Sequence, residues 1–202
     1  MSTIYLRQYD PPPIDRREIL RYAGVRKDTP ELEEPLSLCI EEAQKALTYR
    51  VCFAEFPVTH LTDSVDLGFM ITRSRSLAHH LEGCESILLF AATVGTGIDR
   101  LMARSAPLSP TKALLFQAMG AERIEALCDL FCSEIEQEKA REGYVCTSRF
   151  SPGYGDFGLD AQREIFSVLD CPRKIGLHLG ESLLMTPTKS VTAMVGLAPK
   201  KR

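Results

Sequence analysis

The sequence has no long hydrophobic run and no concentration of positive charge. A membrane-spanning helix needs about 20 mostly apolar residues, and the sequence contains no uninterrupted apolar run of about 18 residues. The first residues also lack the apolar core of a secretory signal. The 24 Lys and Arg residues form no stripe, and 27 Asp and Glu residues bring the net charge to −3. We therefore expect a cytoplasmic protein that binds neither membranes nor nucleic acid.

Few residues could ligate a metal ion or build a disulfide framework. The 7 cysteines are odd in number and scattered, without a C-x-x-C pair. Cys128 and Cys132 are four apart on a predicted helix, which is a weak metal signature. The adjacent His79 and His80 point in different directions on a helix. We predict reduced, mostly buried thiols and no metal site.

No arrangement typical of nucleophilic catalysis is present. Ser151, Ser182 and Ser190 lack a G-x-S-x-G context and an obvious His/Asp companion. Residues 95–97, Gly-Thr-Gly, lie between a predicted strand and a predicted helix, where a phosphate could bind. Because the Walker lysine and a complete G-x-G-x-x-G are missing, the pattern favours a structural turn.

The order of the predicted elements favours the α+β class, with a mixed or antiparallel twisted sheet and flanking helices. Residues 86–94 are apolar on both faces, which predicts a central buried strand. A long helix is expected from Ser109-Pro110 to about residue 142, with Gly143 as its stop. We expect one domain over 1–202, mostly helical to residue 48, although this length also permits two small lobes. Further strands are predicted at 4–6, 51–57, 65–71, 175–179 and 190–197, and helices at 16–23, 30–47, 74–81 and 159–169.

Residues 149–156 read R-F-S-P-G-Y-G-D, which is poor material for a helix or a central strand. Gly153 and Gly155 permit positive φ and a close approach of the backbone to a ligand. Arg149 offers a planar fork of donors for a carboxylate. Tyr154 offers a ring for a cation or a purine. The alternative is an ordinary surface loop between helices.

Glu125 lies among small side chains on the predicted long helix. A lone carboxylate in such surroundings leaves room for a ligand beside it. The alternative is a solvated side chain, as we expect for Glu122 and Glu134, and periodicity alone favours this alternative. Together with Arg149, Gly153 and Tyr154, however, Glu125 would suit a zwitterionic or cationic ligand, such as an amino acid or a sulfonium compound. The small neighbours at spacings of three and four are Ala118, Ala121, Cys128 and Cys132.

Two motifs resemble those of a known family. R-x-x-x-G-Y at 149–154, followed by L-G-E-S-x-x-M-x-P-x-x-S-V at 179–191, resembles the C-terminal reactivation (activation) domain of cobalamin-dependent methionine synthase. Residues 117–126 resemble the helix before the loop in that family. The resemblance covers roughly residues 113–197. It implies the same fold, in the form of the short, free-standing relatives of the domain.

The resemblance implies a binding site for S-adenosylmethionine. Arg149 would take the methionine carboxylate, and Glu125 would accept from the amino group or favour the sulfonium charge. Gly153 and Tyr154 would contact the ligand through backbone and ring. Ser151 stands where the family has an alanine whose backbone contacts the ligand.

The resemblance also implies partners and an activity. An early family aspartate has Asp10 and Asp15 as candidates by position. The partner would be a cobalamin-binding methionine synthase or a related corrinoid protein that supplies the cobalamin. A flavodoxin- or ferredoxin-like donor would supply an electron for reductive methylation of cob(II)alamin. We expect a stand-alone reactivation subunit with no self-standing active site. Two alternatives are a sensing module for S-adenosylmethionine or amino acids, and a scaffold that has lost the ligand.

Overall fold

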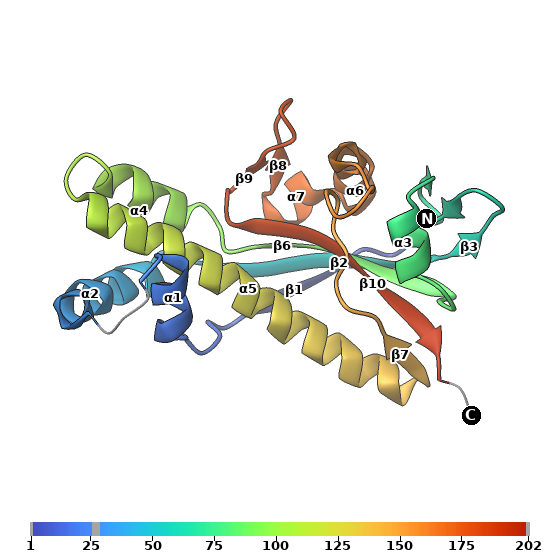
Figure 1. Ribbon diagram of the computed structural model, residues 1–202, viewed down its shortest axis with the longest axis horizontal. Coiled ribbons are helices and arrows are strands. Elements are labelled where there is room, and N and C mark those ends of the chain that lie inside the picture. The colour runs from blue at the N-terminus through green and yellow to red at the C-terminus, as the bar shows by residue number, and fades with distance from the viewer. Residues whose placement is uncertain (1, 26–28, 201–202) are drawn as a thin grey trace.

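The computed structural model describes residues 2–25 and 29–200, and its centre is a five-stranded sheet (Figure 1). The strand order is β1-β2-β6-β10-β7, and every neighbouring pair is antiparallel. The predicted α+β class is therefore confirmed, with the antiparallel form of the sheet. The bounds are Tyr5–Tyr9 (β1), Tyr49–Pro57 (β2), Ser86–Thr93 (β6), Tyr144–Cys146 (β7) and Ser190–Pro199 (β10). Short strands form two smaller sheets: Thr59–His60 (β3), Val65–Asp66 (β4), Ile71–Thr72 (β5), His178–Leu179 (β8) and Met185–Thr186 (β9).

Helices cover both faces of the main sheet. The long helix α5 crosses one face diagonally, and three shorter helices pack near its N-terminal half (Figure 1). These are α1 (Arg16–Tyr22), α2 (Glu33–Gln44) and α4 (Gly97–Ser105), beside α5 (Pro110–Arg141). The opposite face carries α3 (Arg75–His80), α6 (Gln162–Leu169) and α7 (Cys171–Ile175). Single 3-10 turns, Pro30–Leu32 and Leu159–Ala161, lead into α2 and α6.

Strand β6 is the central strand that the sequence predicted. Its side chains alternate between two cores, because successive residues of a strand point to opposite faces. Phe90 faces α5, where its ring lies 4.9 Å from that of Phe131. Leu89 belongs to the second core, together with Ile165 of α6. Burial on both faces explains the uninterrupted apolar character of this segment.

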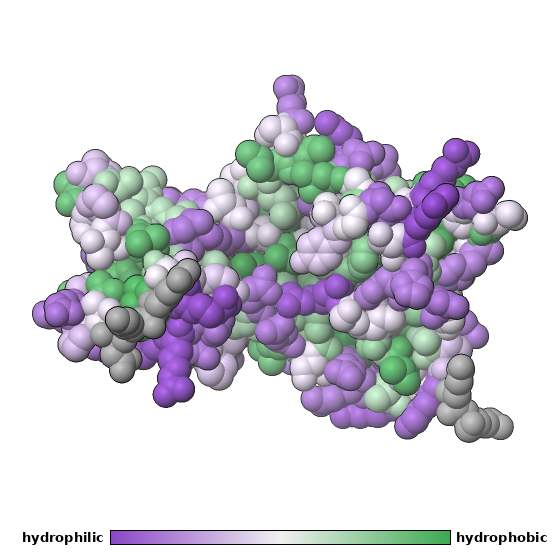
Figure 2. Space-filling view, in the orientation of Figure 1, coloured by the Kyte–Doolittle hydropathy of each residue, from purple (hydrophilic) through white to green (hydrophobic). Residues whose placement is uncertain are grey.

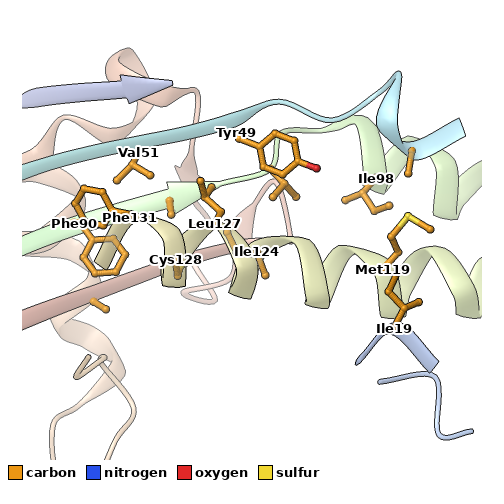
Figure 3. Packing of buried hydrophobic residues seen from close by; sticks show 14 of the residues in the cluster. Ile19, Tyr49, Val51, Phe90, Ile98, Met119, Ile124, Leu127, Cys128 and Phe131 are labelled. Carbon is orange, nitrogen blue, oxygen red and sulfur yellow. The ribbon is translucent and has the colours of Figure 1, made fainter. Parts of the chain in front are cut away.

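Helix α5 also follows its prediction. The side chain of Ser109 accepts a hydrogen bond from the N–H of Lys112 at 3.3 Å, and Pro110 occupies the first turn. Gly143 follows the end with a φ of +90°. Figure 3 shows Ile124, Leu127 and Phe131 pointing from α5 towards the strands. The helix therefore presents its other faces to solvent and to the loop that follows β7.

Two strand predictions are wrong, both for reasons of local backbone geometry. Residues 65–71 form two short strands, because Gly68 turns the chain with a φ of +76° and donates its N–H to Asp66. The predicted strand 175–179 is reduced to β8. Asp170, with a φ of 49°, ends α6, and Cys171 then begins α7. A proline at the start of a helix costs no hydrogen bond, so Pro172 fits there.

The environment of Glu122 also differs from the expectation. Glu122 is buried, because the neighbouring Arg123 binds its carboxylate inside the protein. Glu134 is partly exposed and accepts hydrogen bonds from Arg7 and Tyr9. All seven cysteines are free and five are buried, as predicted. Within the described ranges, no helix is long and apolar enough to cross a membrane, and no group of three or more His, Cys, Asp and Glu residues could hold a metal ion.

Candidate functional site

Arg149 joins the segment after β7 to the middle of α5. Its Nη2 atom donates to Glu125 Oε2 at 3.0 Å and to Asp129 Oδ1 at 2.9 Å. The two carboxylates are one helical turn apart, so they lie on the same side of α5. We call Glu125, Asp129 and Arg149 the arginine cluster. The structure thus brings together Glu125 and Arg149, which the sequence analysis had grouped in one candidate site.

Asp129 is the member of the cluster that the sequence analysis missed. Its four-residue spacing from Glu125 was the available signal, because that spacing places two side chains on one helix face. The side chains of Arg149, Glu125 and Asp129 are 27%, 43% and 70% exposed. The cluster therefore lies at the surface, where a solute can reach it.

The charge of Arg149 is secured by its neighbours. Partial burial by itself would lower the pKa of the guanidinium, but nearby groups, including Glu125 and Asp129, raise it above the ordinary value. One cation faces two carboxylates, so the cluster carries a net charge of about −1. A hollow of about 320 Å³ adjoins it, lined by Cys132, Glu136, Cys146, Thr147, Ser148, Arg149 and Val195. A ligand bound at Arg149 has space on this side.

The start of the loop is fixed to the sheet. Phe150 and Met194 exchange both of their backbone N–H···O hydrogen bonds, each at 2.9 Å. The ring of Phe150 packs against His80 of α3, with ring centroids 4.8 Å apart. Because Phe150 is anchored in this way, the preceding residue, Arg149, leaves the sheet edge in a defined direction.

Gly153 and Tyr154 lie where a ligand could reach them. Gly153 has a φ of +93°, and its N–H donates to the carbonyl of Phe157 at 2.7 Å. A Cβ atom on Gly153 would meet nothing closer than Leu159 Cδ1, at 3.8 Å, so this side of the backbone is open. Tyr154 is exposed, and its N–H binds the carbonyl oxygen of Ser151 at 3.1 Å. The Ser151 carbonyl therefore already accepts one hydrogen bond within the loop.

Gly155 has a different role from the one expected. A Cβ atom there would lie 2.4 Å from Ser76 Oγ, so this glycine lets the loop approach α3, not a ligand. The next residue, Asp156, accepts hydrogen bonds from the Ser74 hydroxyl and from the N–H groups of Arg75 and Ser76. The loop is thus fastened to the start of α3, which leaves Gly153 as its open position.

Residues 179–191 have structural roles. They form the β8–β9 hairpin and its return to the sheet. The hydroxyl of Ser190 lies 2.8 Å from both Thr93 Oγ1 and Pro187 O, which ties β10 to β6. Thr188 donates its N–H to Asp99 of α4 at 3.1 Å. These contacts hold the hairpin on the sheet.

Asp10 and Asp15 lie outside the arginine cluster. Asp15 caps α1 by accepting from the N–H groups of Arg17 and Glu18. Asp10 lines a separate hollow that also includes Glu134. Neither carboxylate is hydrogen-bonded to the cluster in the described structure.

The glycines at 95–97 serve packing. A Cβ atom on Gly97 would lie 2.0 Å from the carbonyl oxygen of Ala46, and one on Gly95 would lie 2.4 Å from Thr48 Oγ1. The turn therefore packs directly against the segment before β2. This supports the structural interpretation over a phosphate site.

Hydrophilic and hydrophobic side chains occupy different regions of the surface. On the face shown in Figure 2, hydrophilic side chains cross the middle of α5, and hydrophobic ones gather around β8, α6 and α7. Fold and site together define an α+β domain that presents a cluster of charged side chains on a long helix. The sheet, the helices and the anchored loop fix the position of this cluster.

Comparison with known proteins identifies the family. The family model described as "Vitamin B12 dependent methionine synthase, activation domain" matches residues 75–202. The chain belongs to this family. A solved structure described as "Crystal Structure of the MetH Reactivation Domain bound to AdoHcy" has a TM-score of 0.67 and 18% identity, over 99% of this chain and 80% of that chain. The fold is therefore that of the reactivation domain. No curated protein matches the sequence.

Proposed function

We propose that this chain binds S-adenosylmethionine at the arginine cluster and presents its methyl group for the reactivation of a cobalamin-dependent methionine synthase. The observation that carries the proposal is the contact of Arg149 with Glu125 and Asp129, within the part of the chain that matches the family. The similar solved domain, which is described as bound to AdoHcy, supports a ligand of this class. The chain would act as a stand-alone subunit on a partner protein.

Each predicted residue has a part in this proposal. Arg149 binds the ligand carboxylate through its fork of donors. Glu125 uses Oε2 for Arg149, and Oε1 has no hydrogen bond within the described chain, so it can accept from the ligand amino group. Gly153 and Tyr154 offer open backbone and an exposed ring. Ser151 contributes a backbone contact, since its carbonyl oxygen accepts from Tyr154 and keeps a second lone pair.

The contribution of the domain to the reaction is positioning. Holding a reactant in the right place can supply much of a rate enhancement without an acid, base or nucleophile. When bound to its partner, cobalamin supplies the reduced cobalt centre that takes the methyl group, with the electron coming from a flavodoxin- or ferredoxin-like protein. The residues of this chain hold the sulfonium end of the ligand towards that partner.

The thiols beside the site do not compete for the methyl group. Burial raises the pKa of Cys132 to about 11 and also raises that of Cys128. Only the thiolate is a strong nucleophile, so both residues are inert near neutral pH. The site can therefore hold a methyl donor without methylating itself.

Calorimetric titration with S-adenosylmethionine tests the binding step. We expect saturable binding that Arg149→Ala abolishes. Arg7→Ala is the matched control, since Arg7 also pairs with two carboxylates of α5 and has a side chain that is 25% exposed. Equal loss of binding in both variants would point to a general effect on α5 and contradict the proposed site.

A second assay tests the transfer step. The wild-type chain, a corrinoid partner and a reductant are incubated with S-adenosylmethionine carrying a labelled methyl group. Transfer of the label that depends on Arg149 supports a reactivation subunit. Binding without transfer would instead favour the sensing module. No binding, with or without the partner, would leave the scaffold.

A further inference from the structure

Arg149 uses a single nitrogen for both of its carboxylates. A guanidinium can bind a carboxylate bidentately along two edges, Nε with Nη2 or Nη1 with Nη2. Both edges include Nη2, and the two protons of Nη2 go to Glu125 and Asp129. Within the described chain, both carboxylate contacts of Arg149 use Nη2, and the thiol of Cys128 is a further neighbour of the guanidinium. Each edge is therefore half occupied, and a ligand carboxylate that binds bidentately must displace one of the two residues.

We propose that Asp129 is the residue displaced: it holds the place of the ligand carboxylate on Arg149, so ligand binding is an exchange of one carboxylate for another. This inference rests on the proposed function, because it concerns the same site. Asp129 thereby limits how strongly the site prefers ligands that carry a carboxylate over ligands that lack one.

The exposure of the two residues decides which one leaves. The Asp129 side chain is 70% exposed, against 43% for Glu125, so a released Asp129 returns to water at a smaller cost. Glu125 has a reason to stay. It can hold Arg149 through Oε2 while Oε1 accepts from the ligand amino group. One carboxylate then keeps the guanidinium oriented, and the other makes way.

Arg7 shows what a closed arrangement looks like on the same helix. Its Nη1 binds Glu134 at 3.1 Å, and its Nη2 binds both carboxylate oxygens of Glu138, at 2.9 and 2.7 Å. Two nitrogens are engaged there, whereas Arg149 engages one. Of these two sites, the arginine cluster is therefore the one that can open for a ligand.

The test compares two ligands that differ only in the carboxylate. Wild type and Asp129→Asn are titrated with S-adenosylmethionine and with its decarboxylated analogue. Both ligands keep the amino group and the sulfonium and differ by the carboxylate charge, so a control variant must report the general effect of losing one negative charge on α5. The quantity compared is the ratio of the Kd of the analogue to the Kd of S-adenosylmethionine. We expect this ratio to be about threefold to tenfold higher in Asp129→Asn than in wild type, since an amide competes less well than a carboxylate for Arg149. Glu138→Gln, which removes the same charge elsewhere on α5, should leave the ratio unchanged.

Thermal unfolding of each variant checks that it is folded before the titration. An unchanged ratio in Asp129→Asn, or a ratio shifted towards the analogue, overturns the inference and leaves the proposed function standing. Failure of the wild-type chain to bind S-adenosylmethionine overturns both. A shift of the ratio that Glu138→Gln reproduces shows a general charge effect and also overturns the inference.

Discussion

Glu122 and Arg123 are neighbours in the sequence and form an ion pair that the protein buries. The guanidinium is almost fully enclosed, and it also donates to the carbonyl oxygens of Pro12 and Pro13, the latter at 2.7 Å. Glu122 in turn accepts from the N–H of Asp15 at 3.1 Å. The pair therefore fastens the segment between β1 and α1 to helix α5.

Removing one partner of this pair leaves a buried charge without compensation. We expect Arg123→Ala to lower the free energy of unfolding by about 3–5 kcal/mol, measured by urea denaturation. Arg16→Ala is the control, because Arg16 pairs with Glu33 at the surface, and it should cost at most about 1 kcal/mol. Similar losses of unfolding free energy in the two variants would show that burial does not make the Glu122–Arg123 pair more important than a surface pair.

Asp156 links the stability of the loop to pH. The Ser74 hydroxyl and the N–H groups of Arg75 and Ser76 hold the pKa of Asp156 well below its usual value of 3.8. A carboxyl group with a lowered pKa in the folded state stabilises the protein above that usual value, and the contribution is lost as the pH falls further. The midpoint of thermal unfolding should therefore differ most between wild type and Asp156→Ala near neutral pH.

The same comparison at lower pH tests whether Asp156 stabilises the loop through its charge. Below about pH 4 the gap between the two midpoints should narrow, because the unfolded chain then takes up a proton on Asp156 while the folded protein still holds the carboxylate ionised. A gap that stays constant down to about pH 2.5 would show that Asp156 acts through packing and not through its charge.

The two glycines of the loop should respond differently to alanine. Gly155→Ala places a Cβ atom 2.4 Å from Ser76 Oγ at a φ of +55°, so we expect a loss of about 3 kcal/mol. Gly153→Ala meets open space and suffers only the strain of positive φ, about 1 kcal/mol. Thermal or urea unfolding measures both. Ligand binding should be lost more in Gly153→Ala, relative to the change in stability, because that position faces the open side.

The thiols should be unreactive in the folded protein. Burial raises the pKa of Cys39 and of Cys132 to about 11. At about pH 7.5 we expect slow alkylation by iodoacetamide, and rapid alkylation of all seven cysteines in urea, where the thiol pKa returns to about 8.5. Peptide mass spectrometry identifies the modified residues. Fast labelling of Cys132 in the native protein would contradict the raised pKa of its thiol.

The local elements of this protein follow directly from its sequence. The apolar segment of β6 and the capped, periodic helix α5 were both predictable, because hydrophobic periodicity and capping act over a few residues. Where local signals conflicted, prediction failed. The glycine turn at Gly68 divides a segment that the apolar pattern joined, and a new helix, α7, begins at Cys171 and shortens the strand predicted at 175–179.

The sequence by itself determined the family motifs and an order of elements that is compatible with an antiparallel sheet. It also identified Glu125 and Arg149 as candidate ligand-binding residues. Only the tertiary structure decided how these residues are used. Asp129 is 20 residues from Arg149 in the chain, and Glu122 is buried by a segment more than 100 residues away. Such contacts depend on which segments pack against each face of α5, and no local pattern records that choice.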